Sequence, residues 1–144
     1  MRKFIGCIAG LLLVAACSSV APIPIKDGDV CYRCRQLITD PNIAGELLGQ
    51  RGIATTFGSA GCLSQYLAEH SNDTSTAFVA DNISGRLTPV ANLLFVPTVN
   101  RSNGERIYKA FLKKEVAEQV AKESNATTMT WQQVLEKAKS GQGN

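Results

Sequence analysis

Histidine is almost absent from this 144-residue sequence, which contains only His70. With no Ser/His/Asp set and no paired carboxylates to place, we expect a protein that is not an enzyme. The residue directly after Cys34 is Arg35 and not histidine, and this excludes the c-type haem attachment motif. An excess of basic charge is also lacking. If Arg2 and Lys3 are removed with a signal peptide, 13 basic and 12 acidic residues remain, so nucleic acid is not an expected partner.

No apolar run is long enough to span a bilayer, which takes about 20 residues. Residues 4–13 are apolar, follow a short basic start and lead into Val14-Ala15-Ala16-Cys17. This pattern predicts a signal peptide over residues 1–16. Val-Ala-Ala-Cys resembles the lipobox of bacterial lipoproteins, whose cysteine is diacylated before cleavage and N-acylated afterwards. The alternative is a chance cysteine near the cleavage site of a soluble secreted protein.

Lipidation of Cys17 would anchor the protein firmly, because each buried methylene stabilises by about 0.8 kcal/mol and several chains act together. Ser18, in place of an aspartate, favours the outer membrane over the inner one, with the protein facing the periplasm. Residues 17–30 contain two prolines and no hydrophobic period, so we expect a lipidated tether that runs extended to the fold.

The remaining chain divides into two units, 31–85 and 86–144, with similar expected elements. In the first unit we expect strands at 31–38, 53–57 and 76–80, and a helix that begins after Ser59 as N-cap. In the second we expect strands at 93–96, 107–112 and 127–130, a helix at 113–124 and a terminal helix at 131–139. A shift of 54 residues aligns five identical pairs: Phe57/Phe111, Gln65/Gln119, Glu69/Glu123, Thr74/Thr128 and Thr76/Thr130. The sequence therefore predicts an α+β fold of two similar strand–strand–helix–strand units packed together.

Three of the five cysteines remain available for chemistry, because Cys7 leaves with the signal and Cys17 is acylated. Cys31 and Cys34, two residues apart, can hold one metal ion at about 2.3 Å per thiolate. Cys62, at the start of a helix, could supply a third thiolate, and soft sulfur ligands favour Cu(I). Basic neighbours and the helix N-terminus would lower the pKa of these thiols.

Other interpretations of the cysteines remain open. Cys31 and Cys34 could form a redox-active or structural disulfide in an oxidising compartment. Cys62 would then be a small core residue, as its counterpart Val116 suggests. The three cysteines could also do no more than pack. His70 lies eight residues after Cys62, about 12 Å along a helix, which is too far to share a metal, so we expect it to cap the helix C-terminus.

A series of motifs carries a resemblance to a known family. They are Cys31-Tyr32-Arg33-Cys34, Phe57-Gly58-Ser59-Ala60-Gly61-Cys62-Leu63, Phe78-Val79 with Asp81, Phe95-Val96, Tyr108-Lys109-Ala110-Phe111 and Trp131-Gln132-Gln133-Val134-Leu135. In this order they resemble the NosL family, lipoproteins that deliver copper to periplasmic nitrous-oxide reductase. The resemblance implies a pair of strand–strand–helix–strand units, a copper-chaperone role and a periplasmic metalloenzyme as client.

The sequence departs from the family where methionine is expected. Arg35-Gln36 follows Cys34 in place of Gly-Met, Leu63 follows Cys62 in place of Met, and residues 97–100 replace a Thr-Pro-Met-Gly stretch. Met129 is the only methionine after the signal peptide. The resemblance therefore implies a divergent member in which Cys31, Cys34 and Cys62 would bind Cu(I) without thioether ligands. The competing interpretation is a structural or thiol-redox envelope lipoprotein with a Cys31–Cys34 disulfide and no metal.

Overall fold

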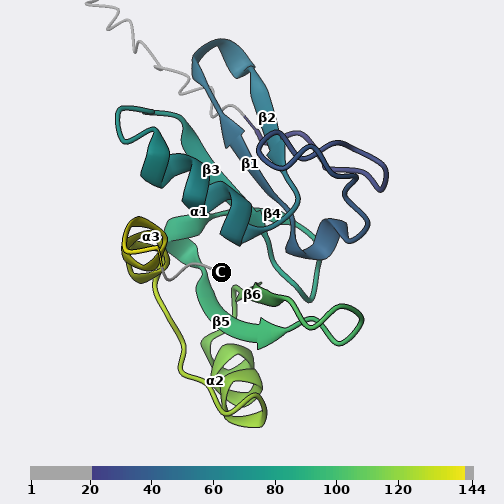
Figure 1. The fold of residues 1–144 in the computed structure, drawn as a ribbon, viewed down its shortest axis with the longest axis vertical. Helices are drawn as coiled ribbons and strands as arrows, with labels where there is room; N and C mark the ends of the chain where they lie inside the picture. The colour runs from purple at the N-terminus through teal and green to yellow at the C-terminus, as the bar shows by residue number, and fades with distance from the viewer. Residues whose placement is uncertain (1–20, 142–144) are drawn as a thin grey trace, which may run out of the picture.

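The computed structural model describes residues 21–141 (Figure 1). The predicted signal peptide and Cys17 lie outside these residues. The strands are β1 (Gly45–Leu48), β2 (Ala54–Phe57), β3 (Thr76–Ala80), β4 (Leu87–Pro89), β5 (Leu94–Val99) and β6 (Arg106–Phe111). The α-helices are α1 (Ala60–Glu69), α2 (Lys114–Glu123) and α3 (Trp131–Lys139), and the short 3-10 helices are η1 (Pro41–Ile43), η2 (Gln50–Gly52) and η3 (Val90–Asn92). Over this part of the chain, no helix has the length and apolar character needed to cross a membrane.

The larger sheet has four antiparallel strands in the order β2-β1-β3-β4. Gly45, on β1, pairs with Phe57 on one side and Val79 on the other, so these three residues share the face that α1 covers. A side chain at Gly45 would lie only 2.9 Å from Leu63 Cδ2 of α1. Glycine at this position therefore allows the helix to pack closely against the sheet, where Leu63 is fully buried.

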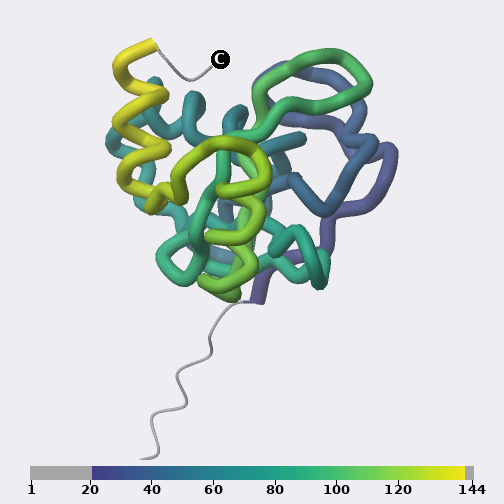
Figure 2. The backbone as a smooth tube through the Cα atoms, turned by 90° about the horizontal axis from the view of Figure 1, so that it is seen from below, coloured from purple at the N-terminus to yellow at the C-terminus, as the bar shows by residue number. Residues whose placement is uncertain are grey.

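The smaller sheet pairs β5 with β6, and α2 packs against it at the end of the molecule away from the β1–β2 hairpin (Figure 1). Helix α3 returns to lie beside α1, as Figure 2 also shows. One buried cluster contains Phe57 and Leu63 from the first half together with Phe95, Tyr108 and Val134 from the second. The two halves of the chain therefore bury apolar surface against each other.

Most of the sequence prediction agrees with this α+β architecture. β3 and α3 coincide with the expected segments 76–80 and 131–139. Ser59 caps α1 by accepting a hydrogen bond from the Cys62 N–H at 3.1 Å. The bounds of α1 and α2 differ by the same 54 residues as the aligned pairs. Ala117 and Ala121 are buried on α2, as the expected apolar stripe requires.

Two expected strands are wrong. Residues 31–38 form a turn closed by a single bridge between Val30 and Leu37, and the first strand is β1. β1 escaped prediction because all four of its residues are buried, including Glu46, so it shows no polar–apolar alternation. The expected strand at 127–130 is reduced to one bridge between Met129 and Phe95, and β4 was not predicted.

Candidate metal centre

The first two cysteines stand on a tight turn at the edge of the larger sheet. The Cys31 N–H donates to the Gln36 carbonyl, and the Arg35 N–H donates to the Cys31 carbonyl, each at 2.9 Å. Arg35 has a left-handed backbone (φ 63°), which reverses the chain after Cys34. The Tyr32 N–H donates to the Thr56 carbonyl at 2.8 Å and fixes the turn to β2. The backbone of Cys31 is thus held on both sides.

The third cysteine comes from the first turn of α1. Gly58 and Ser59 link β2 to this helix, and the Ser59 hydroxyl accepts from the Cys62 N–H. This N-cap places Cys62 at a fixed height above the sheet, next to the Cys31–Cys34 turn.

The structure brings all three predicted ligands together. The Sγ atoms of Cys31, Cys34 and Cys62 all lie within 4.8 Å of one another, and each carries a free thiol. Three sulfurs at about 2.3 Å from one ion are about 4 Å apart, so small side-chain rotations suffice to bind a metal. Cys31 is 1% exposed, Cys62 is half-buried and Cys34 is exposed. The site is therefore closed on the protein side and open at Cys34.

The thiols differ in their electrostatics. Burial opposes ionisation of Cys31, but hydrogen bonds from the backbone N–H groups of Cys34 and Gly58 outweigh it and lower the pKa of this thiol. Burial raises the pKa of Cys62 to about 12, and the nearby charge of Cys31 adds to the increase. The expectation that the helix N-terminus lowers the pKa of Cys62 is therefore wrong. Burial beside another thiolate dominates over the dipole of the helix.

The two arginines of the turn have their direct side-chain contacts outside the thiol group. Arg33 forms an ion pair with Glu69, the last residue of α1, at 2.8 Å. The Arg35 guanidinium lies 5.0 Å from the centre of the Tyr32 ring. We expected these arginines to lower the pKa of a neighbouring thiol. At Cys31 it is the backbone N–H groups that lower the pKa.

An aromatic group stands next to the turn and α1. Tyr32 packs edge-on against Phe57 and Tyr66, with ring centres 6.2 and 5.7 Å apart. His70 stacks on Tyr66 at 4.1 Å, and its Nδ1 lies 2.9 Å from the Tyr66 carbonyl. His70 is the C-cap of α1, as predicted, and does not join the cysteine group. Glu69 and the Gly58 N–H could not be predicted as neighbours of the site, because neither has a local sequence pattern that marks it.

The fold and these residues define a small α+β protein with a candidate site of three thiols. No protein-family model matches the sequence, and no curated protein matches it. Among solved structures, the fold is similar to the crystal structure of the copper chaperone NosL from Shewanella denitrificans, with a TM-score of 0.68 and 18% identity. The match covers 81% of this chain and 96% of that one. The chain therefore has a NosL-like fold, as its motifs predicted.

Proposed function

We propose that this protein is a NosL-like accessory protein that binds Cu(I) through Cys31, Cys34 and Cys62 and passes it to a copper protein. The observation that carries the proposal is the grouping of three Sγ atoms within 4.8 Å, from a turn and a helix far apart in sequence. The likeness of the fold to a protein described as a copper chaperone supports it. Copper is cargo here, so the protein's task is binding and release, not catalysis.

The composition of the site favours Cu(I) over other metals. Soft thiolates stabilise Cu(I), which accepts two or three ligands. A structural zinc site has four protein ligands, and in residues 21–141 the group contains three. Met129, the one methionine in residues 21–141, is buried and pairs with Phe95 of β5, so the ligands that we propose are thiolates alone.

The difference in exposure suggests how copper leaves. Cys31 is buried and hydrogen-bonded through its backbone, and Cys62 is fixed by the start of α1. Cys34 is exposed on the turn. A ligand of the receiving protein can therefore replace Cys34 first, while the other two thiolates still hold the ion.

We also propose that the protein is a lipoprotein, anchored through Cys17 and facing the periplasm, and that the anchor lies in the outer membrane. The lipobox-like Val14-Ala15-Ala16-Cys17 and Ser18 support this proposal. A periplasmic copper enzyme is the corresponding client.

Titration of the reduced protein with Cu(I) under argon, against a chromophoric chelator, tests the function. We expect one Cu(I) per chain. Cys34→Ser should weaken binding by roughly tenfold or more, equivalent to about 1.4 kcal/mol. Met129→Leu, a methionine outside the group, is the matched control and should bind as the wild type does. Absence of Cu(I) uptake by the reduced wild-type protein would reject the proposal.

A thiol-redox role is the second candidate, because the lowered pKa of Cys31 beside Cys34 is typical of reactive dithiols. Protein isolated from the periplasm with its thiols blocked at once distinguishes the two functions. A Cys31–Cys34 disulfide in that material, together with no Cu(I) uptake after reduction, would favour the redox role.

A further inference from the structure

A buried carboxyl group on β1 has no part in the site described above. Glu46 is the only ionisable side chain in the four strands of the larger sheet, and it is fully buried. One carboxyl oxygen, Oε1, accepts a hydrogen bond from the Ile23 N–H at 3.0 Å. The other oxygen, Oε2, is buried without a hydrogen-bond partner. A charged carboxylate in this position would be costly, because it lacks both water and a counter-ion.

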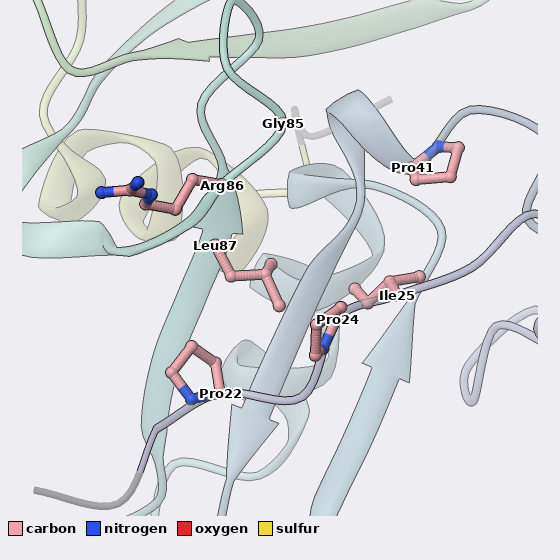
Figure 3. A pocket seen from close by; sticks show the side chains of 7 residues that line it. All are labelled: Pro22, Pro24, Ile25, Pro41, Gly85, Arg86 and Leu87. Atoms are coloured by element: carbon pink, nitrogen blue, oxygen red, sulfur yellow. The ribbon is translucent and has the colours of Figure 1, made fainter.

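Glu46 faces the side of the sheet opposite to α1. It pairs with Thr56 on β2 and Phe78 on β3, one residue out of phase with Gly45, which faces the helix. This outer face is crossed by residues 21–25, which we call the strap (Figure 3). The Ile23 N–H reaches Glu46 from the strap, and Ile25 packs against the core.

Beside the strap lies a cavity, and Ile25 and Glu46 mark its contacts with the rest of the fold. A cavity of about 190 Å³ separates Pro22, Pro24 and Ile25 from Pro41 and from Leu87 of β4. In Figure 3 the strap runs past β1, and the Leu87 side chain extends toward Pro24. Pro22 and Pro24 have no N–H to donate. The hydrogen bond to Glu46 is therefore a specific polar attachment for this stretch of chain.

The surroundings of Glu46 offer no charge to stabilise its ionised form. Strands β2, β3 and β4, helix η1 and the strap carry no ionisable side chain. The charged residues that flank these elements or lie in their connecting turns are Lys26, Asp40, Arg51, Asp73, Asp81 and Arg86. Burial raises the pKa of Glu46 above its ordinary value of 4.5, and the Ile23 N–H opposes this only in part.

We propose that the strap is a releasable latch: uncharged Glu46 holds it on the outer face of the sheet, and ionisation of Glu46 releases it. The direction of this pH effect follows from a comparison of Glu46 with the strap closed and with the strap open. With the strap closed, Glu46 keeps its proton to a higher pH than when the strap is open and the carboxyl meets water. A rise in pH above about 4.5 therefore favours the open state until the pH passes the pKa of the closed state.

The strap is the middle part of the predicted tether, residues 17–30, and so precedes the candidate metal centre in the chain. After Ile25 the chain continues over the outer face, where Thr56 Oγ1 donates to the Val30 carbonyl at 3.2 Å, and then rounds the β2 edge to the Cys31 turn. If the chain is anchored at Cys17, as proposed above, release of the five strap residues adds up to about 17 Å to its reach from the membrane. The latch itself does not depend on copper binding.

Hydrogen exchange of the Ile23 amide, followed by NMR between pH 4.5 and 8, tests the latch. The observable is the protection factor, in which the intrinsic pH dependence of exchange is divided out. We expect protection of Ile23 to fall by up to tenfold per pH unit and then to level off above the pKa of closed Glu46. The Ala80 amide, which donates to the Ala44 carbonyl inside the sheet, is the internal control and should remain protected.

Glu46→Gln shows whether the pH dependence of Ile23 protection comes from Glu46, because glutamine keeps an acceptor for the Ile23 N–H and cannot ionise. Its Ile23 protection should not change with pH. Constant protection of Ile23 in the wild type would overturn the proposal, and so would a parallel loss at Ala80 or a wild-type pH dependence in E46Q. If E46Q does not fold, the comparison of Ile23 with Ala80 in the wild type decides alone. Cu(I) uptake does not enter these measurements, so the latch and the proposed function can fail separately.

Discussion

Asp81 Oδ1 accepts a hydrogen bond from the Leu112 backbone N–H at 3.1 Å, across the junction of the two sheets. Asp81 follows β3 and Leu112 follows β6, so this contact joins the two halves of the chain. The other oxygen of Asp81 accepts from the N–H and the hydroxyl of Ser84, at 3.0 and 2.7 Å. A buried carboxylate thus closes the turn after β3 and fixes β6 beside it.

Asp81→Ala should lower the free energy of unfolding by about 1–3 kcal/mol, because it leaves the Leu112 and Ser84 N–H groups without their acceptor. Asp27→Ala, at an exposed aspartate, is the control and should change stability little. Chemical denaturation of the two variants measures the difference. Equal stability of both would show that water replaces Asp81 fully.

The contribution of Asp81 should also depend on pH. Burial opposes its ionisation, but the Ser84 and Leu112 hydrogen bonds outweigh burial and lower the pKa below its ordinary value of 3.8. The folded state therefore holds its proton less tightly than the unfolded state does. The stabilisation is complete above about pH 4 and is lost as the pH falls through the folded pKa. In Asp81→Ala this part of the acid destabilisation should be missing.

The sequence predicted those parts of the fold whose signals are local. Helix α1 begins at the predicted N-cap, Ser59, and the apolar stripe predicted for α2 is buried at Ala117 and Ala121. β1 could not be predicted, because burial of Glu46 depends on a strap that arrives from 21 residues or more upstream. Propensity carries no information about such a distant partner.

The sequence predicted which three thiols form the candidate site, but not how the site shifts the pKa of Cys62. The Cys31–Cys34 spacing and the helix start at Cys62 identified the three thiols. The repeat, however, suggested a core role for Cys62, because Val116 is its counterpart. Residues 85–92, the counterpart of the Cys31 turn, form β4 and η3 instead. Val116 therefore has no turn with cysteines beside it, as Cys62 has. The same position of the repeat lies beside two thiols in the first unit and not in the second.

Cys17→Ser tests the proposed anchor. The wild-type protein should sediment with membranes and remain there in high salt, because buried acyl chains are not displaced by ions. The variant should appear in the soluble fraction of the envelope. Cys7→Ser, within the predicted signal peptide, is the matched control and should fractionate as the wild type does. Salt-resistant membrane association of Cys17→Ser would place the anchor elsewhere.

Cys62→Val distinguishes a ligand from a core residue, because valine has a similar size and no sulfur. As Cys62 lies within 4.8 Å of two thiols, the variant should bind Cu(I) roughly tenfold or more weakly. Its stability should change by less than about 1.5 kcal/mol, since volume-conserving apolar substitutions are well tolerated. Competition with a chromophoric chelator and thermal unfolding measure the two effects on the same sample.

The serine variant makes the comparison sharper. Cys62→Ser also removes the thiolate, but it places a hydroxyl on a half-buried face and should cost about 1–3 kcal/mol if the hydroxyl finds no partner. Loss of copper affinity in the valine and serine variants alike, with a clear loss of stability only in the serine variant, would establish Cys62 as the third ligand. Copper affinity at the wild-type level in Cys62→Val would instead assign Cys62 to the core and leave Cys31 and Cys34 as a two-coordinate site.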